Sequence, residues 1–270
     1  AYYRYLPVPG EKVDAAAGIC AHFLQRGHIK PHRSRMNTAC WSDDGRRLVC
    51  GTESGDFALW DAETFKFDRL VGAHKYFTEG RQVVAVPIRA MAWHDYGQLM
   101  ISGDNDGVIK YANVSLKNMH TISDAHQGAV RSLSFSPFES KFVSCSDDGL
   151  VKIWDQEKCE VEQTWSEHLT EVRSAKWHPT RALVASASKD TTVRLWDPKA
   201  PTSIGTIWEH KKHILALDWS ASGQYLATGS KDYSLKIFDV RMLGRVLRTL
   251  KGHDADVTCL KWHTIHENLL

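Results

Sequence analysis

Short runs of alternating apolar and polar residues, separated by turn-forming residues, fill most of the chain. VRSLSFS (130–136) and LVKIWD (150–155) have the two-residue period of strands, and they are bounded by turn sequences such as SPFE and DDG. No stretch shows the 3.6-residue period of an amphipathic helix. The pattern predicts an all-β chain.

Marker residues recur at one spacing, which indicates an internal repeat of 42 residues. Five histidines are separated by 52, 42, 42 and 43 residues: His74, His126, His168, His210 and His253. An aromatic residue ends one strand of most repeats: Trp60, Trp154, Trp196 and Phe238, with Ala112 at the corresponding place in the second repeat. An acid six residues earlier (Asp106, Asp148, Asp190, Asp232) and a Ser or Thr four residues before that (Ser102, Ser144, Ser186, Thr228) keep the same phase, and the first repeat has Ser54 and Cys50 there.

These markers resemble the WD40 repeat, whose blades are four-stranded antiparallel sheets arranged as a β-propeller. The resemblance implies a hydrogen-bonded set of histidine, Ser/Thr, Asp and Trp in each blade. Two sets are complete: His126, Ser144, Asp148, Trp154 and His168, Ser186, Asp190, Trp196. The set His210, Thr228, Asp232 ends in Phe238, which has no N–H, and the set His74, Ser102, Asp106 ends in Ala112. A His–Asp–Ser constellation that recurs in every repeat is architectural rather than catalytic, so we expect no enzyme activity.

The markers place the blades at about 36–60, 88–112, 129–154, 171–196 and 213–238, with a partial sixth over 256–270. Residues 1–35 are expected to form a lead-in and a ring-closing strand. WD40 rings usually have seven blades, so we expect a truncated ring and a fragment that is poorly soluble by itself. A ten-residue insertion, KYFTEGRQVV (about 75–84), lengthens the connection between the first two blades.

Composition argues against several classes of function but does not assign one. The formal net charge of +2 excludes a polybasic protein that coats nucleic acid, although a local basic stretch such as RGHIKPHRSR (26–35) could contact phosphate. The six cysteines form no C-x-x-C pair and favour a reducing compartment. The histidines belong to different blades, so neither a metal nor another cofactor is expected. No apolar run approaches the ~18 residues of a membrane span, so no membrane partner is expected.

A closer resemblance covers essentially the whole chain. The lead-in AYYRYLPVPG, the segment DDGRRLVCGTESGDFALWDAETFKFDRL and KWHPTRALVASASKDTTVRLWDPK are similar to the WD-repeat subunit of the cleavage and polyadenylation specificity factor. The first blade is the specific part, because most WD repeats have Asp in place of Ser54. The resemblance implies a nuclear scaffold subunit of pre-mRNA 3′-end processing that helps to recognise the AAUAAA signal.

The same resemblance implies the contacts. Phe67 would stack on a base of the signal, Leu70 would support it, and Lys30 would approach the RNA. A zinc-finger subunit and a large multi-propeller subunit would be partners. Phe65 alternates with Phe67, so we expect Phe65 to face the blade interior and Phe67 to contribute little to packing.

Two other binding functions stay open. One is a substrate receptor of a cullin-type ubiquitin ligase, since Phe238-Asp239-Val240-Arg241 approximates the WD-x-R sequence of that class. The other is a generic protein-interaction scaffold.

Overall fold

The computed structural model describes residues 34–42, 45–64, 66–77, 83–94, 99–242, 245–263 and 269–270. Residues 34–270 form one compact unit, separate from residues 1–33. Within the described ranges, no helix is long and apolar enough to cross a membrane.

Five four-stranded antiparallel sheets follow one another along the chain, and each is one blade. Blade 1 contains β1 (Met36–Trp41), β2 (Arg47–Thr52), β3 (Asp56–Asp61) and β4 (Phe67–Gly72). Blade 2 contains β7 (Ile88–Trp93), β8 (Leu99–Asp104), β9 (Ile109–Asn113) and β10 (Asn118–Ile122). Blade 3 contains β11 (Val130–Phe135), β12 (Lys141–Ser146), β13 (Val151–Asp155) and β14 (Glu160–Trp165).

The last two blades have the same order. Blade 4 contains β15 (Val172–Trp177), β16 (Val184–Ser188), β17 (Val193–Trp196) and β18 (Ser203–Ile207). Blade 5 contains β19 (Ile214–Trp219), β20 (Tyr225–Ser230), β21 (Ser234–Asp239) and β22 (Val246–Lys251), with a short 3₁₀ turn η2 (Val240–Met242) before β22. The predicted all-β propeller with five complete blades is confirmed.

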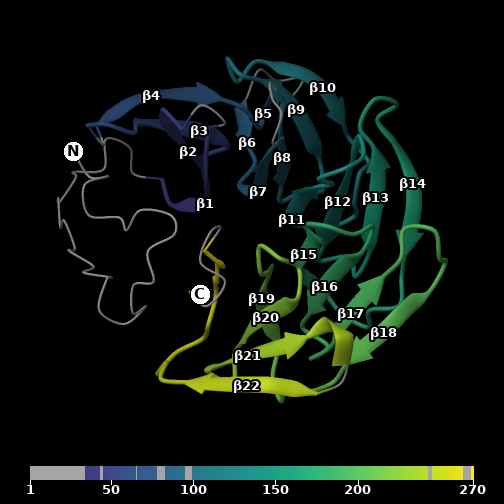
Figure 1. The fold of residues 1–270 in the computed structure, drawn as a ribbon. Helices are drawn as coiled ribbons and strands as arrows, with labels where there is room; N and C mark the ends of the chain where they lie inside the picture. Colours follow the sequence, from purple (N-terminus) through teal and green to yellow (C-terminus); the bar gives the residue numbers. More distant parts are fainter. Residues whose placement is uncertain are drawn as a thin grey trace. The chain divides into compact units, whose positions relative to one another are not determined.

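The core lies between the faces of consecutive blades. The first strands β1, β7, β11, β15 and β19 contact one another in that order and are innermost, while the fourth strands are outermost (Figure 1). Apolar clusters join each pair of neighbouring blades, so the second strand of each blade is buried over most of its length. The fourth strands lie outside the ranges expected from the aromatic markers, because they carry no marker and four of the five are exposed over half or more of their residues.

Close contact between blades requires small residues on the second strands. A Cβ on Gly103 would lie 2.5 Å from Cγ1 of Val130, the first residue of the next blade. The same contact recurs after blade 5, where a Cβ on Gly229 would lie 2.6 Å from Cγ1 of Val257. Val257 therefore occupies the place of a sixth blade's innermost strand. Residues 252–263 nevertheless form no β-strand.

The insertion forms a separate two-stranded sheet, β5 (Lys75–Phe77) and β6 (Val83–Ala85). All three residues of β6 are exposed. Where the structure describes them, the extra residues between blades 1 and 2 therefore form a β-hairpin.

Candidate nucleic-acid interface

The expected RNA contacts of blade 1 lie on its outermost strand. Phe67 begins β4, and Leu70 lies three residues further along it. Lys30 and Phe65 fall outside the residues that the structure describes. Phe67 and Leu70 are therefore the two expected contact residues with a defined geometry.

A β-bulge brings these two side chains to one face. In the pairing of β3 with β4, Trp60 lies opposite Phe67 and Ala58 lies opposite Leu70, with a register shift between the pairs at Asp68. Directly opposed residues share a face of the sheet, whereas a three-residue spacing in a regular strand would place its ends on opposite faces. The additional residue of the bulge compensates for the odd spacing.

Phe67 also packs against the blade. Its ring centroid lies 5.6 Å from that of Trp60 at an interplanar angle of 77°, an edge-to-face contact. The ring joins the apolar cluster of Cys50, Ala58 and Trp60 and is half-buried, whereas Leu70 is 44% exposed. The expectation that Phe67 contributes little to packing is wrong, because the bulge turns it onto Trp60.

The inserted hairpin is anchored to an acid of each neighbouring blade. Lys75 Nζ lies 2.6 Å from Oδ1 of Asp56 in blade 1, and the Tyr76 hydroxyl donates to Asp104 in blade 2 over 3.0 Å. Lys110 Nζ lies 4.4 Å from the centre of the Tyr76 ring, a cation–π contact. The hairpin is thus fixed at its base while Val83 and Val84 stay 54% and 45% exposed.

Blades 3 and 4 bring together the residues of their expected hydrogen-bonded sets. In blade 3, His126 Nδ1 lies 2.9 Å from Asp148 Oδ2, and Nε2 lies 2.7 Å from Ser144 Oγ. Trp154 Nε1 donates to the same Ser144 oxygen over 2.8 Å. Blade 4 repeats these contacts at 2.8, 2.7 and 2.8 Å with its own residues: His168, Asp190, Ser186 and Trp196.

The hydrogen-bonded set of blade 5 lacks the tryptophan member. His210 lies 3.0 Å from Asp232 and 2.7 Å from the Thr228 hydroxyl. Phe238 occupies the tryptophan position, is 1% exposed and donates no hydrogen bond, as the sequence indicates.

Blade 2 differs from the expectation, because its acid is Asp104 and not Asp106. His74 Nδ1 lies 2.8 Å from Asp104 Oδ2, and Nε2 lies 2.8 Å from Ser102 Oγ. Asp104 Oδ1 accepts from the amides of Asp106 and Val108, both over 2.9 Å. Asp104 stands where the later blades have a serine, and from there it also reaches Tyr76 of the inserted hairpin.

Blade 1 carries an acid that the repeat alignment misses. Asp56 is 6% exposed, accepts a hydrogen bond from the Ser54 hydroxyl over 2.9 Å and pairs with Lys75. The Thr52 hydroxyl bonds the Asp56 carbonyl oxygen over 2.8 Å. Asp56 is therefore a buried, paired residue rather than a surface position outside the pattern.

In the set of blade 3, burial keeps the His–Asp–Ser constellation away from any substrate. Burial lowers the pKa of His126 more than the hydrogen bond and charge of Asp148 raise it, so the imidazole is neutral. Burial opposes ionisation of Asp148, but the hydrogen bond and charge of His126 and the Leu150 amide lower its pKa overall. The Trp154 N–H occupies Ser144 Oγ, so the Ser144 proton goes to Nε2, and Ser144 is 0% exposed. No substrate atom can reach this oxygen.

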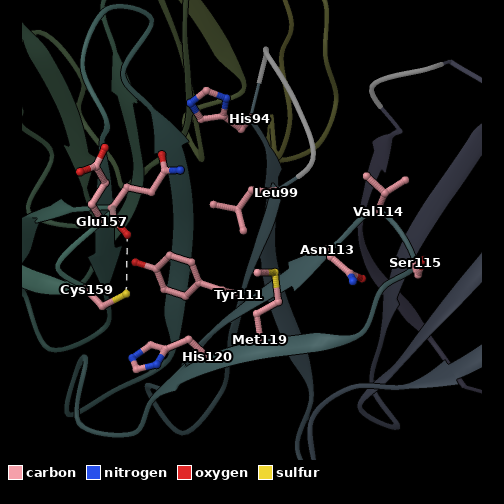
Figure 2. A pocket seen from close by; sticks show the side chains of 11 residues that line it. His94, Leu99, Tyr111, Asn113, Val114, Ser115, Met119, His120, Glu157 and Cys159 are labelled. Atoms are coloured by element: carbon pink, nitrogen blue, oxygen red, sulfur yellow. Dashed lines mark hydrogen bonds between the residues drawn. The ribbon is translucent and has the colours of Figure 1, made fainter.

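A groove of about 870 Å³ lies between blades 2 and 3. Figure 2 shows Tyr111 between His94 at one end and His120 with Cys159 at the other. The His120 ring packs edge-on against Tyr111, with centroids 5.9 Å apart, and Cys159 Sγ donates to the Gln156 carbonyl over 3.6 Å.

Two further expectations from the sequence concern the Phe-Asp-Val-Arg segment and metal binding. Arg241 of the Phe-Asp-Val-Arg segment pairs with the adjacent Asp239, with 2.9 Å between Nη2 and Oδ2. In the part of the chain that the structure describes, no group of three or more His, Cys, Asp or Glu side chains could hold a metal ion.

Comparison with known proteins supports the repeat assignment. A family model described as WD domain, G-beta repeat matches residues 22–61, 82–111 and 116–155. A model described as IFT140 first beta-propeller matches residues 146–258. The two models together span blades 1 to 5.

Curated relatives share one description, polyadenylation factor subunit 2. The protein of Candida albicans is 35% identical over 102 residues, which is 38% of this chain and 17% of the relative. That of Cryptococcus neoformans is 35% identical over 134 residues, 50% of this chain and 17% of the relative. That of Saccharomyces cerevisiae is 40% identical over 70 residues, 26% of this chain and 13% of the relative.

The aligned segments thus span less than a fifth of these relatives' length. The repeats, the five blades and this similarity agree with one another. The chain has the fold of a WD40-type β-propeller, and over the aligned segments it is similar to polyadenylation factor subunit 2.

Proposed function

We propose that the chain is a non-catalytic WD40 scaffold of the pre-mRNA 3′-end cleavage and polyadenylation machinery, acting in the nucleus. Its specific contribution is to help bind the AAUAAA signal and to hold other subunits of the complex. The observation that supports this most is the pair of side chains on one face of blade 1, where the half-buried Phe67 ring lies on the same face as the exposed Leu70.

The chemistry of that face suits an unpaired base. A base that stacks on an aromatic ring gains about 1–3 kcal/mol, and the contact needs only a partly exposed ring with neighbouring apolar surface. Phe67 is half-buried with its edge contact to Trp60 fixing its orientation, and Leu70 beside it is exposed. A preoriented ring loses little entropy when the base arrives.

Stacking alone does not identify a base, because every base has a π-face. Sequence discrimination therefore falls to hydrogen bonds from other groups, which we assign to a zinc-finger partner. Lys30 would add a phosphate contact, and a large multi-propeller subunit would be the docking partner. The scaffold role is consistent with the buried sets of blades 2 to 5, whose side chains bond one another.

The test measures the affinity for an AAUAAA RNA in the complex with the zinc-finger subunit, at one stated salt concentration. Phe67→Ala should weaken binding about tenfold or more, because the base can no longer stack on the ring. Phe67→Leu keeps an apolar contact with Trp60 but lacks the ring, so it should weaken binding similarly with a smaller loss of stability. Phe138→Ala is the matched control, because Phe138 is 63% exposed on blade 3.

Equal affinities for the wild type and Phe67→Leu would refute the stacking role. Failure of the wild type to prefer AAUAAA over a scrambled RNA in that complex would refute the proposed function itself.

A further inference from the structure

One turn in each of the five blades has a left-handed backbone. In blades 1 to 3 the residue is glycine: Gly55 with φ 71°, Gly107 with φ 88° and Gly149 with φ 82°. Blades 4 and 5 have Thr191 with φ 72° and Tyr233 with φ 65°. A bulky residue rarely adopts this conformation, because its Cβ crowds the backbone, so Tyr233 is retained at a cost in stability. Such outliers concentrate at functional sites.

The Tyr233 side chain is directed to solvent rather than into the core. The residue is 43% exposed, and Lys212 Nζ lies 5.3 Å from the centre of its ring. The preceding residue, Asp232, is held by His210, which fixes the turn beneath the ring. The strained position therefore presents an aromatic ring with a cation over it.

Lys212 lies over this ring, and Lys211 precedes Lys212 in the chain; neither lysine has an acidic partner among the salt bridges of the described residues. Lys211 and Lys212 are both exposed, and the corresponding positions after the histidine carry Gln127 and Gly128 in blade 3. Tyr233 and the two lysines constitute the lysine–aromatic surface of blade 5.

Nearby charges leave these two lysines available. Lys189 Nζ lies 2.6 Å from Glu171 Oε1, and Lys231 Nζ lies 3.5 Å from Asp256 Oδ2. Glu209, two residues before Lys211, has its Oε2 4.0 Å from Lys236 Nζ, so each of these three acids is paired with another lysine. The Asp232 carboxylate accepts from the hydroxyl of Ser234 as well as bonding His210. Its oxygens are thus engaged below the surface.

We propose that the lysine–aromatic surface of blade 5 binds single-stranded RNA without sequence preference. A base stacks on Tyr233, and Lys211 and Lys212 contact the flanking phosphates. An acidic peptide would need the lysines but not an aromatic ring at a strained position, so RNA is the better match. This surface shares its class of ligand with the blade 1 site but does not depend on it.

The experiment uses the protein with a twelve-nucleotide oligouridine RNA that lacks AAUAAA, and measures fluorescence anisotropy over a salt series. Tyr233→Gly relieves the left-handed strain and removes the ring, so it should raise the melting temperature while weakening RNA binding about fivefold or more. Thr191→Gly is the matched control, and it should raise the melting temperature with RNA affinity unchanged. The double variant Lys211→Ala/Lys212→Ala should lower the salt slope by about 0.7 for each phosphate that a lysine no longer neutralises.

Unchanged oligouridine affinity in both Tyr233→Gly and the double lysine variant would overturn the proposal. Weaker binding in the lysine variant alone, with an acidic peptide competing equally well, would identify a peptide surface and also overturn it. Phe67→Leu separates the two sites, because it should leave oligouridine binding by blade 5 intact. A failed AAUAAA preference with intact oligouridine binding would count only against the blade 1 function.

Discussion

Replacing Asp104 with alanine should destabilise the protein far more than replacing Asp106. The repeat alignment selects Asp106, but the structure has Asp104 as the acid of blade 2. Asp104 is 0% exposed and has four bonding partners: His74 Nδ1, the Tyr76 hydroxyl and the amides of Asp106 and Val108. Asp106 is exposed, and it donates to Asp104 through its backbone amide, which alanine retains.

The magnitude follows from those four contacts. A hydrogen bond to a charged group contributes about 1.5–3 kcal/mol, and a buried donor left without a partner costs about 1–3 kcal/mol. The contributions overlap because the donors share one carboxylate, so we expect a loss of about 3–5 kcal/mol for Asp104→Ala. Asp106→Ala should change the free energy of unfolding by no more than about 0.5 kcal/mol.

Urea unfolding followed by circular dichroism measures both variants. Asp104→Asn keeps one oxygen acceptor for the amides but loses the charge, so its stability should lie between those of the wild type and Asp104→Ala. Equal losses for Asp104→Ala and Asp106→Ala would refute the assignment of Asp104.

Three further predictions concern the other blades. Acidification should lower the free energy of unfolding in two stages. Below pH 6.5 the unfolded chain binds a proton at His126, whose pKa is lowered in the folded protein. Below pH 3.8 the unfolded chain also binds a proton at Asp148, whose pKa is likewise lowered in the folded protein. Urea midpoints across this range would check it, and a midpoint that rises on acidification would contradict it. Trp196→Phe should cost about 1 kcal/mol by removing the N–H bond to Ser186, and a thermal melt as stable as the wild type would argue against that bond. Tyr233→Gly should stabilise the protein by about 1 kcal/mol through relief of the left-handed backbone, and a lower melting temperature would disprove the strain.

The repeat could be predicted because its markers are local and chemically distinctive. The histidine, hydroxyl and tryptophan of blades 3 and 4 appear at fixed spacing in the sequence, and the structure joins them by hydrogen bonds. The outermost strands were not predicted. Most residues of β4 and β22, for example, are exposed and follow no fixed apolar pattern.

Blade 2 shows why spacing alone fails where the chain departs from the repeat. Asp104 and Asp106 are two residues apart and both acidic, so the alignment favoured the one in phase. The choice depends on Tyr76, which comes from the inserted hairpin and has no counterpart in the other blades.

The two candidate surfaces rest on backbone features that recur from blade to blade, but the side chains found there differ between blades. Phe67 and Leu70 share a face only because of the bulge at Asp68, and that bulge also turns Phe67 onto Trp60. Tyr233 could have been noticed in the sequence, since it stands where three other repeats have glycine. Its exposure and the contact with Lys212 required the structure.

Photocrosslinking of an AAUAAA RNA to the assembled complex, followed by mass spectrometry of the crosslinked peptides, tests the central claim most directly. The account predicts an RNA adduct on the segment that contains Phe67 and Leu70, and disappearance of that adduct in Phe67→Leu. RNA adducts confined to other subunits or other blades, with none on residues 61–72, would contradict it.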